Sequence, residues 1–435
     1  MNILIISPKI PYPLTEGGTV SQFAIIDYLR KNHTIILVMA TYNSEDEKKI
    51  AALTSLWPEV TIEKIQMLNT LPQFKRRDLN RIQILLLDIQ RKLKYDVKKW
   101  GWNLFHNKKN HEVQISEIDS PWVVQIAVLK NRKLINELLN IVNKHKIDII
   151  QIDLLEYIDL GLVIPKEIKK VFVQHEIKYA RLTTLLKTIS PFETPFNSYV
   201  LDFVRSQEIN LLRMYDGVFV FSEEDRNKLI QDLPGNKVFV TPFPVLDNYF
   251  RPIKTDLLKI EKLVFVGGED NSPNKDAVEW YINTIGSKVR KRHNLILHVV
   301  GKWEKETIEK YTNNELVFFS GFVEDLISYC ENSIMVVPVR IGSGIRAKIL
   351  YAMAQGVPVV SASIGCEGIG VTDKTDLLIA NTPEEFVEAI HSIVINPEMT
   401  YLMVNNAQRL IRKKYSQQVA GDLRLHYLNE IISKS

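Results

Sequence analysis

Cysteine, long apolar runs and strong net charge are all scarce in this chain of 435 residues. Its two cysteines, Cys330 and Cys366, are too few for a disulfide framework, which fits a reducing cytosol. No apolar run reaches the roughly 18 residues that a membrane-spanning helix needs. The formal net charge of +4 is mild and indicates little by itself. These shortages argue against a disulfide-rich secreted scaffold and an integral membrane protein.

What remains is the composition of an ordinary globular protein. Apolar residues make up 46% of the chain and charged residues 24%. The length exceeds that of one ordinary core and indicates two domains. The first seven residues lack the basic start of a signal peptide, so we expect them to form a buried strand of a cytosolic protein.

Short apolar runs alternate with helical patterns throughout the chain, which is typical of βαβ units in a parallel sheet. The expected strands are residues 3–6, 34–40, 61–67, 147–152, 170–174 and 217–222, followed by 262–267, 295–301, 316–320, 334–338, 358–361 and 377–380. The pattern restarts after residues 244–259, which predicts a domain boundary there. Residues 397–435 have a helical pattern.

The most informative motif begins where the apolar run at residues 334–337 ends. A glycine-rich turn, Gly342-Ser343-Gly344, precedes a helical pattern that opens with Arg346 and Lys348. Glycines let backbone amides approach a ligand, and a helix N-terminus favours an anion. Arginine adds a forked donor and lysine a point charge, so the combination suits a diphosphate. The alternative is a plain strand-to-helix turn with solvated basic residues.

Several other segments accompany this motif in a fixed order. They are Phe265-Val266-Gly267-Gly268, Ser272-Pro273-Asn274-Lys275-Asp276-Ala277, Phe319-Ser320-Gly321-Phe322-Val323-Glu324-Asp325-Leu326, the stretch from Gly342 to Val360, and Cys366-Glu367-Gly368-Ile369. Together they resemble the donor-nucleotide site of GT-B glycosyltransferases, in particular glycosyltransferase family 4 (group 1). The resemblance is dense in the C-terminal half and patchy in the N-terminal half.

The resemblance implies an α/β fold of two Rossmann-like parallel-sheet domains that face a cleft. It predicts an acceptor domain at residues 1–250, with a basic helical insertion at about 72–111. A nucleotide-sugar domain is expected at 251–415, and a final helix at 416–435 that returns to the first domain.

The resemblance also implies site residues. Arg346, Lys348 and His175 are the expected catalytic residues. The expected donor-binding residues are Gly17, Gly18, Gly267, Asn274, Gly342, Ser343, Gly344, Tyr351, Glu367 and Gly368. No metal site and no cofactor are expected, because the two cations can replace a metal ion at the diphosphate.

One position departs from the family pattern. A glutamate that binds the donor ribose usually stands just before Ala-Met-Ala, and here Tyr351 occupies that position. Either the Tyr351 hydroxyl or Glu367 takes over the ribose contact, or donor binding is lost.

Two N-terminal candidates also fit purely structural roles. Gly17 and Gly18 follow the first strand, and the turn is either a ligand loop or an ordinary connection. His175 directly follows the strand at 170–174, where open α/β sheets bind ligands, but a lone histidine is also a common structural residue. Ser222 and Asp225 indicate a helix cap, which is a structural role.

Residues 74–109 combine many lysines and arginines with apolar residues at helical spacing and with Trp100 and Trp102. This pattern fits an anionic membrane surface, and equally a helical pair with solvated lysines. A nucleic-acid role is not expected beside two Rossmann-like domains.

The sequence therefore predicts a cytosolic glycosyltransferase, either free or attached to the inner face of a membrane. Its donor would be a nucleotide-diphosphate sugar and its acceptor a hydroxyl of a glycan or lipid-linked glycan, with retention of configuration, in surface polysaccharide synthesis. Two different kinds of protein fit the same motifs. One is a catalytically weak homologue that binds a partner, and the second is another GT-B enzyme, such as a nucleotide-sugar epimerase or a phosphorylase.

Overall fold

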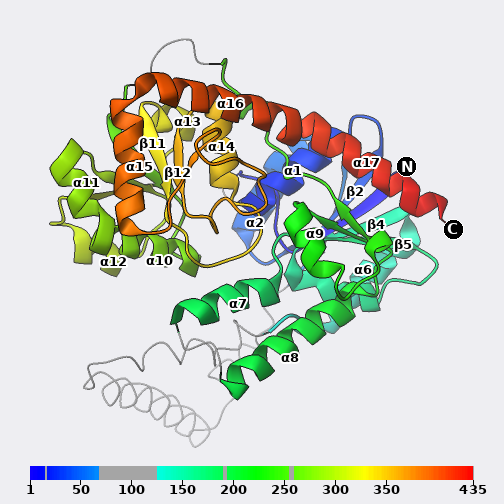
Figure 1. Ribbon diagram of the computed structural model, residues 1–435. Coiled ribbons are helices and arrows are strands. Elements are labelled where there is room, and N and C mark those ends of the chain that lie inside the picture. The colour runs from blue at the N-terminus through cyan, green and yellow to red at the C-terminus, as the bar shows by residue number, and fades with distance from the viewer. Residues whose placement is uncertain (15–16, 68–124, 190–193, 254–258, 435) are drawn as a thin grey trace, which may run out of the picture.

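The computed structural model describes residues 1–14, 17–67, 125–189, 194–253 and 259–434. Its strands form two parallel sheets, each at the centre of one lobe (Figure 1). The predicted basic segment at 74–109 and the whole of the expected insertion at about 72–111 lie outside the described residues.

The first sheet has seven strands in the order β3-β2-β1-β4-β5-β6-β7. Their bounds are β1 Asn2–Ser7, β2 Thr34–Thr41, β3 Thr61–Gln66, β4 Ile149–Asp153, β5 Lys169–Val173, β6 Gly217–Val220 and β7 Val238–Val240. The helices of this lobe are α1 Gly17–Leu29, α2 Ser44–Leu56, α6 Arg132–Lys144, α7 Lys178–Ile189, α8 Pro195–Leu212 and α9 Glu223–Leu229. The sequence predicted these strands except β7, whose three residues are too few for a clear pattern.

The second sheet has six strands in the order β10-β9-β8-β11-β12-β13. Their bounds are β8 Lys262–Val266, β9 Leu297–Val300, β10 Val317–Gly321, β11 Ser333–Val337, β12 Val359–Ser361 and β13 Leu378–Ile379. The helices that accompany it are α10 Ser272–Trp280, α11 Gly286–His293, α12 Lys305–Tyr311, α13 Leu326–Cys330, α14 Ala347–Gln355, α15 Pro383–Ile395 and α16 Pro397–Tyr415. The predicted fold class, two parallel-sheet α/β domains, is confirmed.

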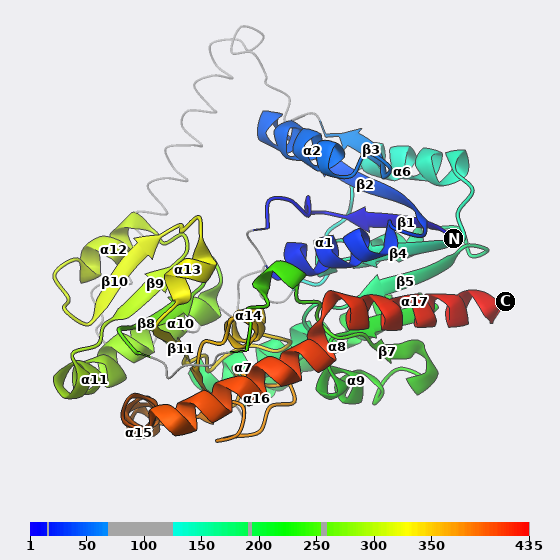
Figure 2. The same ribbon diagram turned by 90° about the horizontal axis from the view of Figure 1, so that it is seen from above.

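Each sheet reverses its strand order once, between β1 and β4 and between β8 and β11. Ligands of open α/β sheets bind outside the carboxyl ends of the strands at such switch points. The helices α1 and α14 follow β1 and β11, strands at the switch points, and in Figure 2 α14 lies on the side of the second sheet that faces α1 and the first lobe. The topology therefore directs both potential ligand sites into the gap between the domains.

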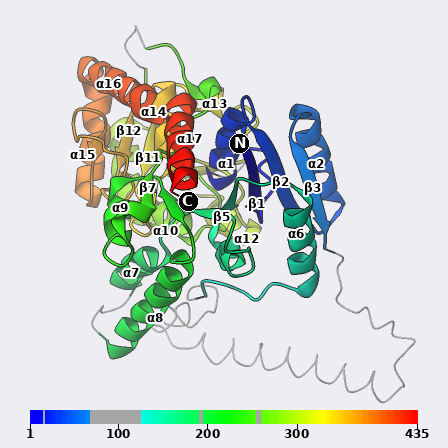
Figure 3. The same cartoon turned by 90° about the vertical axis from the view of Figure 1, so that its right-hand side faces the viewer.

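The last two helices cross from one lobe to the other. The long C-terminal helical stretch is interrupted at Ser416, whose side chain caps α17, Gln417–Ser433, by accepting a hydrogen bond from Val419 N at 3.4 Å. In Figures 1 and 3, α16 leads away from the second sheet and α17 lies over the first lobe. Gln417 Nε2 donates to Ala24 O of α1 at 2.8 Å. The expected return of the final helix to the first domain is observed.

Local sequence explains several helix starts. Thr382 and Glu385 form a reciprocal capping box at α15, with Pro383 in the first turn. Ser222 caps α9 by accepting from Asp225 N at 3.1 Å, so the structural role predicted for Ser222 is confirmed.

Candidate active site between the two domains

The glycine-rich turn after β11 has a conformation that only glycine adopts easily. Gly342 has a φ of 127° and Gly344 a φ of 76°, both in the left-handed region. Space is also restricted: a Cβ on Gly344 would stand 2.8 Å from the carbonyl oxygen of His175. The turn thus lies directly against the loop that follows β5 in the other domain.

Arg346 folds back over this turn. Its Nη1 donates to the carbonyl oxygens of Ser343 and, at 2.6 Å, of Gly344. Its Nη2 is buried and has no hydrogen-bond partner among the described residues. Burial lowers the pKa of Arg346, while Glu176 and Glu367 raise it. Arg346 therefore stiffens the turn with one nitrogen and keeps a donor available with the other.

Lys348 lies two residues after Arg346, in the first turn of α14. Its Nζ donates to Asn274 Oδ1 at 2.8 Å and stands 3.9 Å from the centre of the Phe265 ring. Burial, followed by repulsion from Arg346, lowers the pKa of Lys348 to about 7. Asn274 in turn donates to Gly268 O at 2.8 Å, and a Cβ on Gly267 would meet its amide. The structure thus brings Gly267, Asn274 and Lys348 together.

The N-termini of two helices from different domains meet here. A Cβ on Gly17, the first residue of α1, would stand 3.4 Å from Cβ of Ala347, the first residue of α14. In the described part of the chain no side chain caps α14, because Arg346 occupies its N-cap position without a capping hydrogen bond. Uncapped amides and the positive ends of two helix dipoles therefore face one small region, which favours an anion.

His175 lies beside this region. Its Nε2 is 3.7 Å from Asp153 Oδ1, and its ring makes an edge contact with Phe221 at 5.2 Å between centroids. Its Nδ1 lies close to Gly18, since a Cβ on that glycine would stand 3.5 Å from it. His175 thus lies beside both Gly18 and the glycine-rich turn.

Residues of the first domain already accept hydrogen bonds from two backbone amides of the glycine-rich turn. Gly342 N donates to Thr184 Oγ1 at 2.8 Å, and Ser343 N donates to Glu176 Oε1 at 3.4 Å. Ser343 Oγ donates to Ile177 O at 2.9 Å. Residues of α7 and the loop before it therefore accept hydrogen bonds from the amides of Gly342 and Ser343, and the donor-binding role of these two residues stays a prediction.

Three predicted donor-binding residues have other contacts in the structure. The Tyr351 ring stacks on Tyr249 at 4.3 Å, and its buried hydroxyl has no hydrogen-bond partner among the described residues. Glu367 forms an ion pair of 2.8 Å with Lys228 of α9, which joins the two domains. Gly368 has a φ of 80° and packs against Ser222. Their roles toward a donor stay predictions.

Sequence reasoning missed two buried carboxylates behind the site. Glu208 of α8 accepts from the backbone amides of Lys178 and Tyr179 at 3.0 and 3.1 Å and thereby caps α7. Burial raises its pKa to about 7, although these hydrogen bonds oppose the shift. Its signal was available, since Glu208 continues an apolar i, i+4 stripe formed by Val200, Val204 and Leu212. Asp153 was signalled by its place at the end of a fully buried strand.

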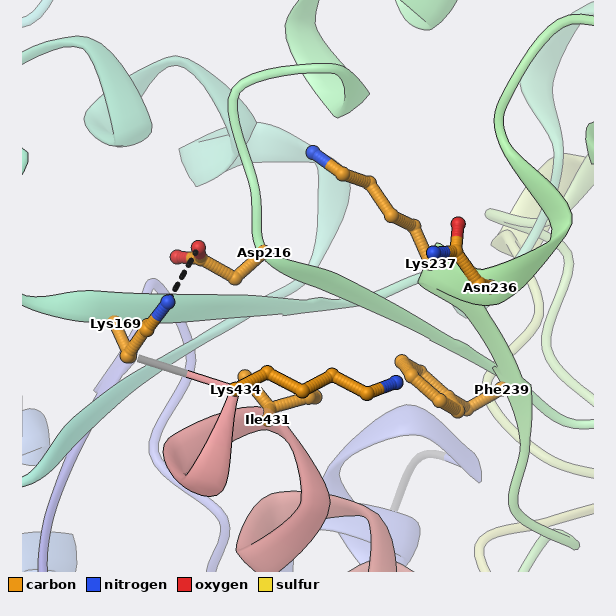
Figure 4. A pocket seen from close by; sticks show the side chains of 7 residues that line it. All are labelled: Lys169, Asp216, Asn236, Lys237, Phe239, Ile431 and Lys434. Carbon is orange, nitrogen blue, oxygen red and sulfur yellow. Dashed lines mark ion pairs between the residues drawn. The ribbon is translucent and has the colours of Figure 1, made fainter.

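A small hollow lies elsewhere on the first domain (Figure 4). It is lined by Lys169, Asp216, Asn236, Lys237, Phe239, Ile431 and Lys434. Lys169, the first residue of β5, and Asp216, the residue before β6, pair at 3.6 Å. These residues stand at the amino ends of the strands, away from the switch points, so we do not assign the hollow to the site.

Within the described residues, no cluster of three or more His, Cys, Asp or Glu side chains is placed to hold a metal ion. None of the described helices is both long and apolar enough to cross a membrane.

Known proteins match parts of this chain in sequence, and solved structures match nearly the whole chain in fold. Residues 260–396 match the family described as "Glycosyl transferases group 1". An uncharacterized 44.6 kDa protein in the cps region of Klebsiella pneumoniae is 27% identical over 179 residues, 38% of this chain and 46% of that protein. Glycosyltransferase 1 domain-containing protein 1 of Xenopus tropicalis is 26% identical over 139 residues, 30% of this chain and 40% of that protein. The chain thus spans less than half the length of these two relatives.

Solved structures match over nearly the whole chain. HepE of Anabaena in complex with UDP has a TM-score of 0.62 at 12% identity, covering 99% of this chain and 100% of that one. Sucrose-phosphate synthase of Thermosynechococcus elongatus has a TM-score of 0.65 at 13% identity, covering 100% of both chains. TarM also has a TM-score of 0.65, at 12% identity, covering 99% of this chain and 98% of that one. The chain therefore has the GT-B fold, and its residues 260–396 are similar to the group 1 glycosyl transferases.

Proposed function

We propose that the chain transfers a sugar from a nucleotide-diphosphate sugar to a hydroxyl of a glycan or lipid-linked glycan. The observation that carries this proposal is the meeting of two helix N-termini, at Gly17 and Ala347, beside Lys348 and Arg346. A diphosphate is the anion that suits two dipoles and two cations in one place.

The proposed chemistry follows from charge. When the bond between the sugar and the β-phosphate breaks, negative charge grows on the departing nucleoside diphosphate. Donors held in place before the reaction stabilise that charge without reorganisation. Lys348 Nζ and the unpartnered Nη2 of Arg346 are the proposed donors. Their charge supports transfer without a metal ion or cofactor, and we propose retention of configuration by the family resemblance.

His175 is proposed to act on the sugar side of the same gap. Its Nδ1 lies beside Gly18, while Asp153 Oδ1 lies 3.7 Å from Nε2. An ionised Asp153 favours a proton on Nε2, which leaves Nδ1 as a hydrogen-bond acceptor in the neutral ring. We propose that this nitrogen contacts a hydroxyl of the donor sugar.

The similar proteins indicate which donors to test first and which biological role to propose. HepE has been crystallised with UDP and with UDP-glucose, so UDP-sugars are the first donors to test. The Klebsiella relative belongs to a cps region, which supports a role in surface polysaccharide synthesis. We also keep the proposal that residues 74–109 attach the protein to the inner, anionic face of a membrane.

Calorimetry with UDP-, GDP- and ADP-sugars tests the donor proposal. A bound donor also raises the unfolding midpoint by mass action. We expect one nucleotide class to bind and Lys348→Ala to weaken that binding, with Lys275→Ala as a matched control on neighbouring α10. Binding by neither the wild type nor any variant would contradict the proposal.

A second function is favoured by one position. Tyr351 offers at most a single phenol where the family has a carboxylate, and its ring is committed to stacking on Tyr249. A homologue that binds a partner without turnover is the proposal to adopt if donors bind but neither transfer nor donor hydrolysis is measured.

A further inference from the structure

The C-terminal helix places an arginine in the interior of the first domain. Arg424 of α17 is 1% exposed, and its guanidinium carbon stands 4.1 Å from the centre of the Phe219 ring. Burial lowers its pKa to about 10. Taking a cation out of water is costly, and an apolar side chain of similar volume would pack there at lower cost.

Docking of the helix does not explain this arginine. Ala420, Leu428 and Ile431 of α17 are buried in the core, and Gly421 lies closely against the ring of Tyr28. Gln417 adds polar contacts to α1 through Ala24 O at 2.8 Å and Asp27 Oδ2 at 3.0 Å. Because the helix already has apolar and polar anchors, the buried charge calls for another reason.

The contacts of Arg424 lead toward the site. Its Nη2 donates to Thr241 Oγ1 at 2.8 Å, and its Nη1 donates to Gln151 Oε1 at 3.0 Å. Gln151 lies in β4, and its Nε2 donates to Asp153 Oδ2 at 3.0 Å. An amide whose oxygen accepts from a guanidinium has only its NH₂ group left to offer, so Arg424 fixes which end of Gln151 faces Asp153.

Asp153 is thereby held in one orientation. Its Oδ2 accepts from Gln151 and also from Gln22 Nε2 of α1 at 3.0 Å, while Gln22 Oε1 accepts from Ser7 Oγ at 3.1 Å. With Oδ2 occupied twice, the other oxygen, Oδ1, is left on the side of His175. It lies 3.7 Å from Nε2, which is an electrostatic contact and not a hydrogen bond, and Nε2 has no hydrogen-bond partner among the described residues. Residues 151 and 153 lie on the same side of a strand, since side chains alternate along it.

We propose that Arg424 is a positioning residue of the active site: it orients Gln151, Gln151 holds Asp153, and Asp153 orients the imidazole of His175. The final helix thus contributes to the site a group that lies far from it in sequence. The effect on catalysis depends on the proposed function, whereas the effect on the orientation of the His175 imidazole does not.

Nuclear magnetic resonance of histidine-labelled protein tests the chain of contacts without activity. The His175 Cε1–Hε1 signal is assigned as the one lost in His175→Gln. We expect it to move in Arg424→Met and to stay in place in Gln417→Ala, which removes another polar anchor of the same helix. In an Asp153→Asn background, adding Arg424→Met should cause no further movement, because coupled residues fail to add.

Kinetics supplies the second readout. We expect Arg424→Met to lower kcat on the order of tenfold, as for a misplaced catalytic group, with the donor KM changed less than about twofold. Arg424→Lys should recover part of the loss, since an ammonium can donate to Gln151 but lacks the fork that also reaches Thr241. Unfolding midpoints of all variants identify any that are damaged globally, and Arg424→Leu serves in place of Arg424→Met if the latter fails to fold.

Three results would overturn the inference. They are an unmoved His175 signal in a folded variant that cannot donate from position 424, additive movements in the double variant, and an equal movement in Gln417→Ala. If the wild type transfers no sugar but the signals behave as expected, the proposed function fails while the positioning chain stands.

Discussion

Lys348 gives the sharpest test of the diphosphate site, because its charge depends on pH. Burial and the neighbouring Arg346 lower its pKa from the usual 10.5 to about 7, so half of the free protein carries a neutral amine at that pH. A diphosphate beside Nζ favours the ammonium and moves the pKa back up. Donor binding above pH 7 must therefore take up a proton.

The size of the effect follows from linkage. If the bound pKa returns to near its usual value, affinity for a nucleotide sugar falls about fivefold from pH 7 to 8 and about 25-fold from pH 6.5 to 8.5. Below pH 6.5 the dependence flattens, because the free lysine is already charged. Calorimetry in buffers of different ionisation enthalpy measures the proton uptake directly, at about 0.9 proton per donor at pH 8.

The same pKa predicts the opposite slope for stability. Between pH 7 and 10.5 the unfolded chain binds a proton on Lys348 that the donor-free folded chain does not, so this residue's contribution to the free energy of unfolding rises with pH. We expect the difference in unfolding midpoint between wild type and Lys348→Met to show this slope.

Lys275 is the matched control. It lies on α10 beside the site, pairs with Glu269 at 2.8 Å, and that hydrogen bond raises its pKa. Lys275→Met should keep the pH dependence of donor affinity, and Lys348→Met should lose it. A flat affinity in the wild type, or the same slope in Lys348→Met, would refute the reasoning.

Three further predictions concern other parts of the molecule. Arg346→Ala should lower turnover on the order of 10²–10³-fold, measured by release of the nucleoside diphosphate, and unchanged turnover would remove Arg346 from the site. Tyr351→Phe keeps the stack on Tyr249 and should leave the unfolding midpoint unchanged, since the hydroxyl has no described partner, while calorimetry should show about fivefold weaker donor binding if that hydroxyl contacts the ribose. Because residues 74–109 are basic, vesicles rich in anionic lipid should retain the protein in sedimentation and release it at high salt, whereas equal retention by neutral vesicles would contradict the membrane proposal.

The sequence predicted the fold well because the two signals behind the prediction, the alternating apolar pattern and the glycine-rich motif, each involve residues that are neighbours in sequence. Alternation of apolar runs with helical patterns identified the strands of both sheets apart from β7. The glycine-rich turn, Arg346 and Lys348 could be predicted to lie together because they are neighbours in sequence at one strand-to-helix junction. Gly267 and Asn274 follow β8, the strand next to β11, so parallel topology brings them to the same edge.

Contacts between distant segments were beyond this reasoning. Nothing local indicates that Thr184 satisfies Gly342 N, because the two residues come from different domains. Arg424 is one of many basic residues in the chain, and only the docking of α17 shows that it is buried. Glu367 was expected at the donor, yet its partner Lys228 lies in α9 and could not be identified from spacing.

The charge of the site explains why it needs both domains. Two buried cations without counter-charges would be costly, and each is moderated in the described state. Arg346 donates to two carbonyl oxygens of its own turn, with Glu176 of the first domain contributing negative charge nearby. Burial lowers the pKa of Lys348 to about 7, so that this side chain is partly neutral near that pH. In the proposed function, a diphosphate bound between α1 and α14 would supply the missing negative charge, and the full positive charge of the site would then develop only when the donor is bound.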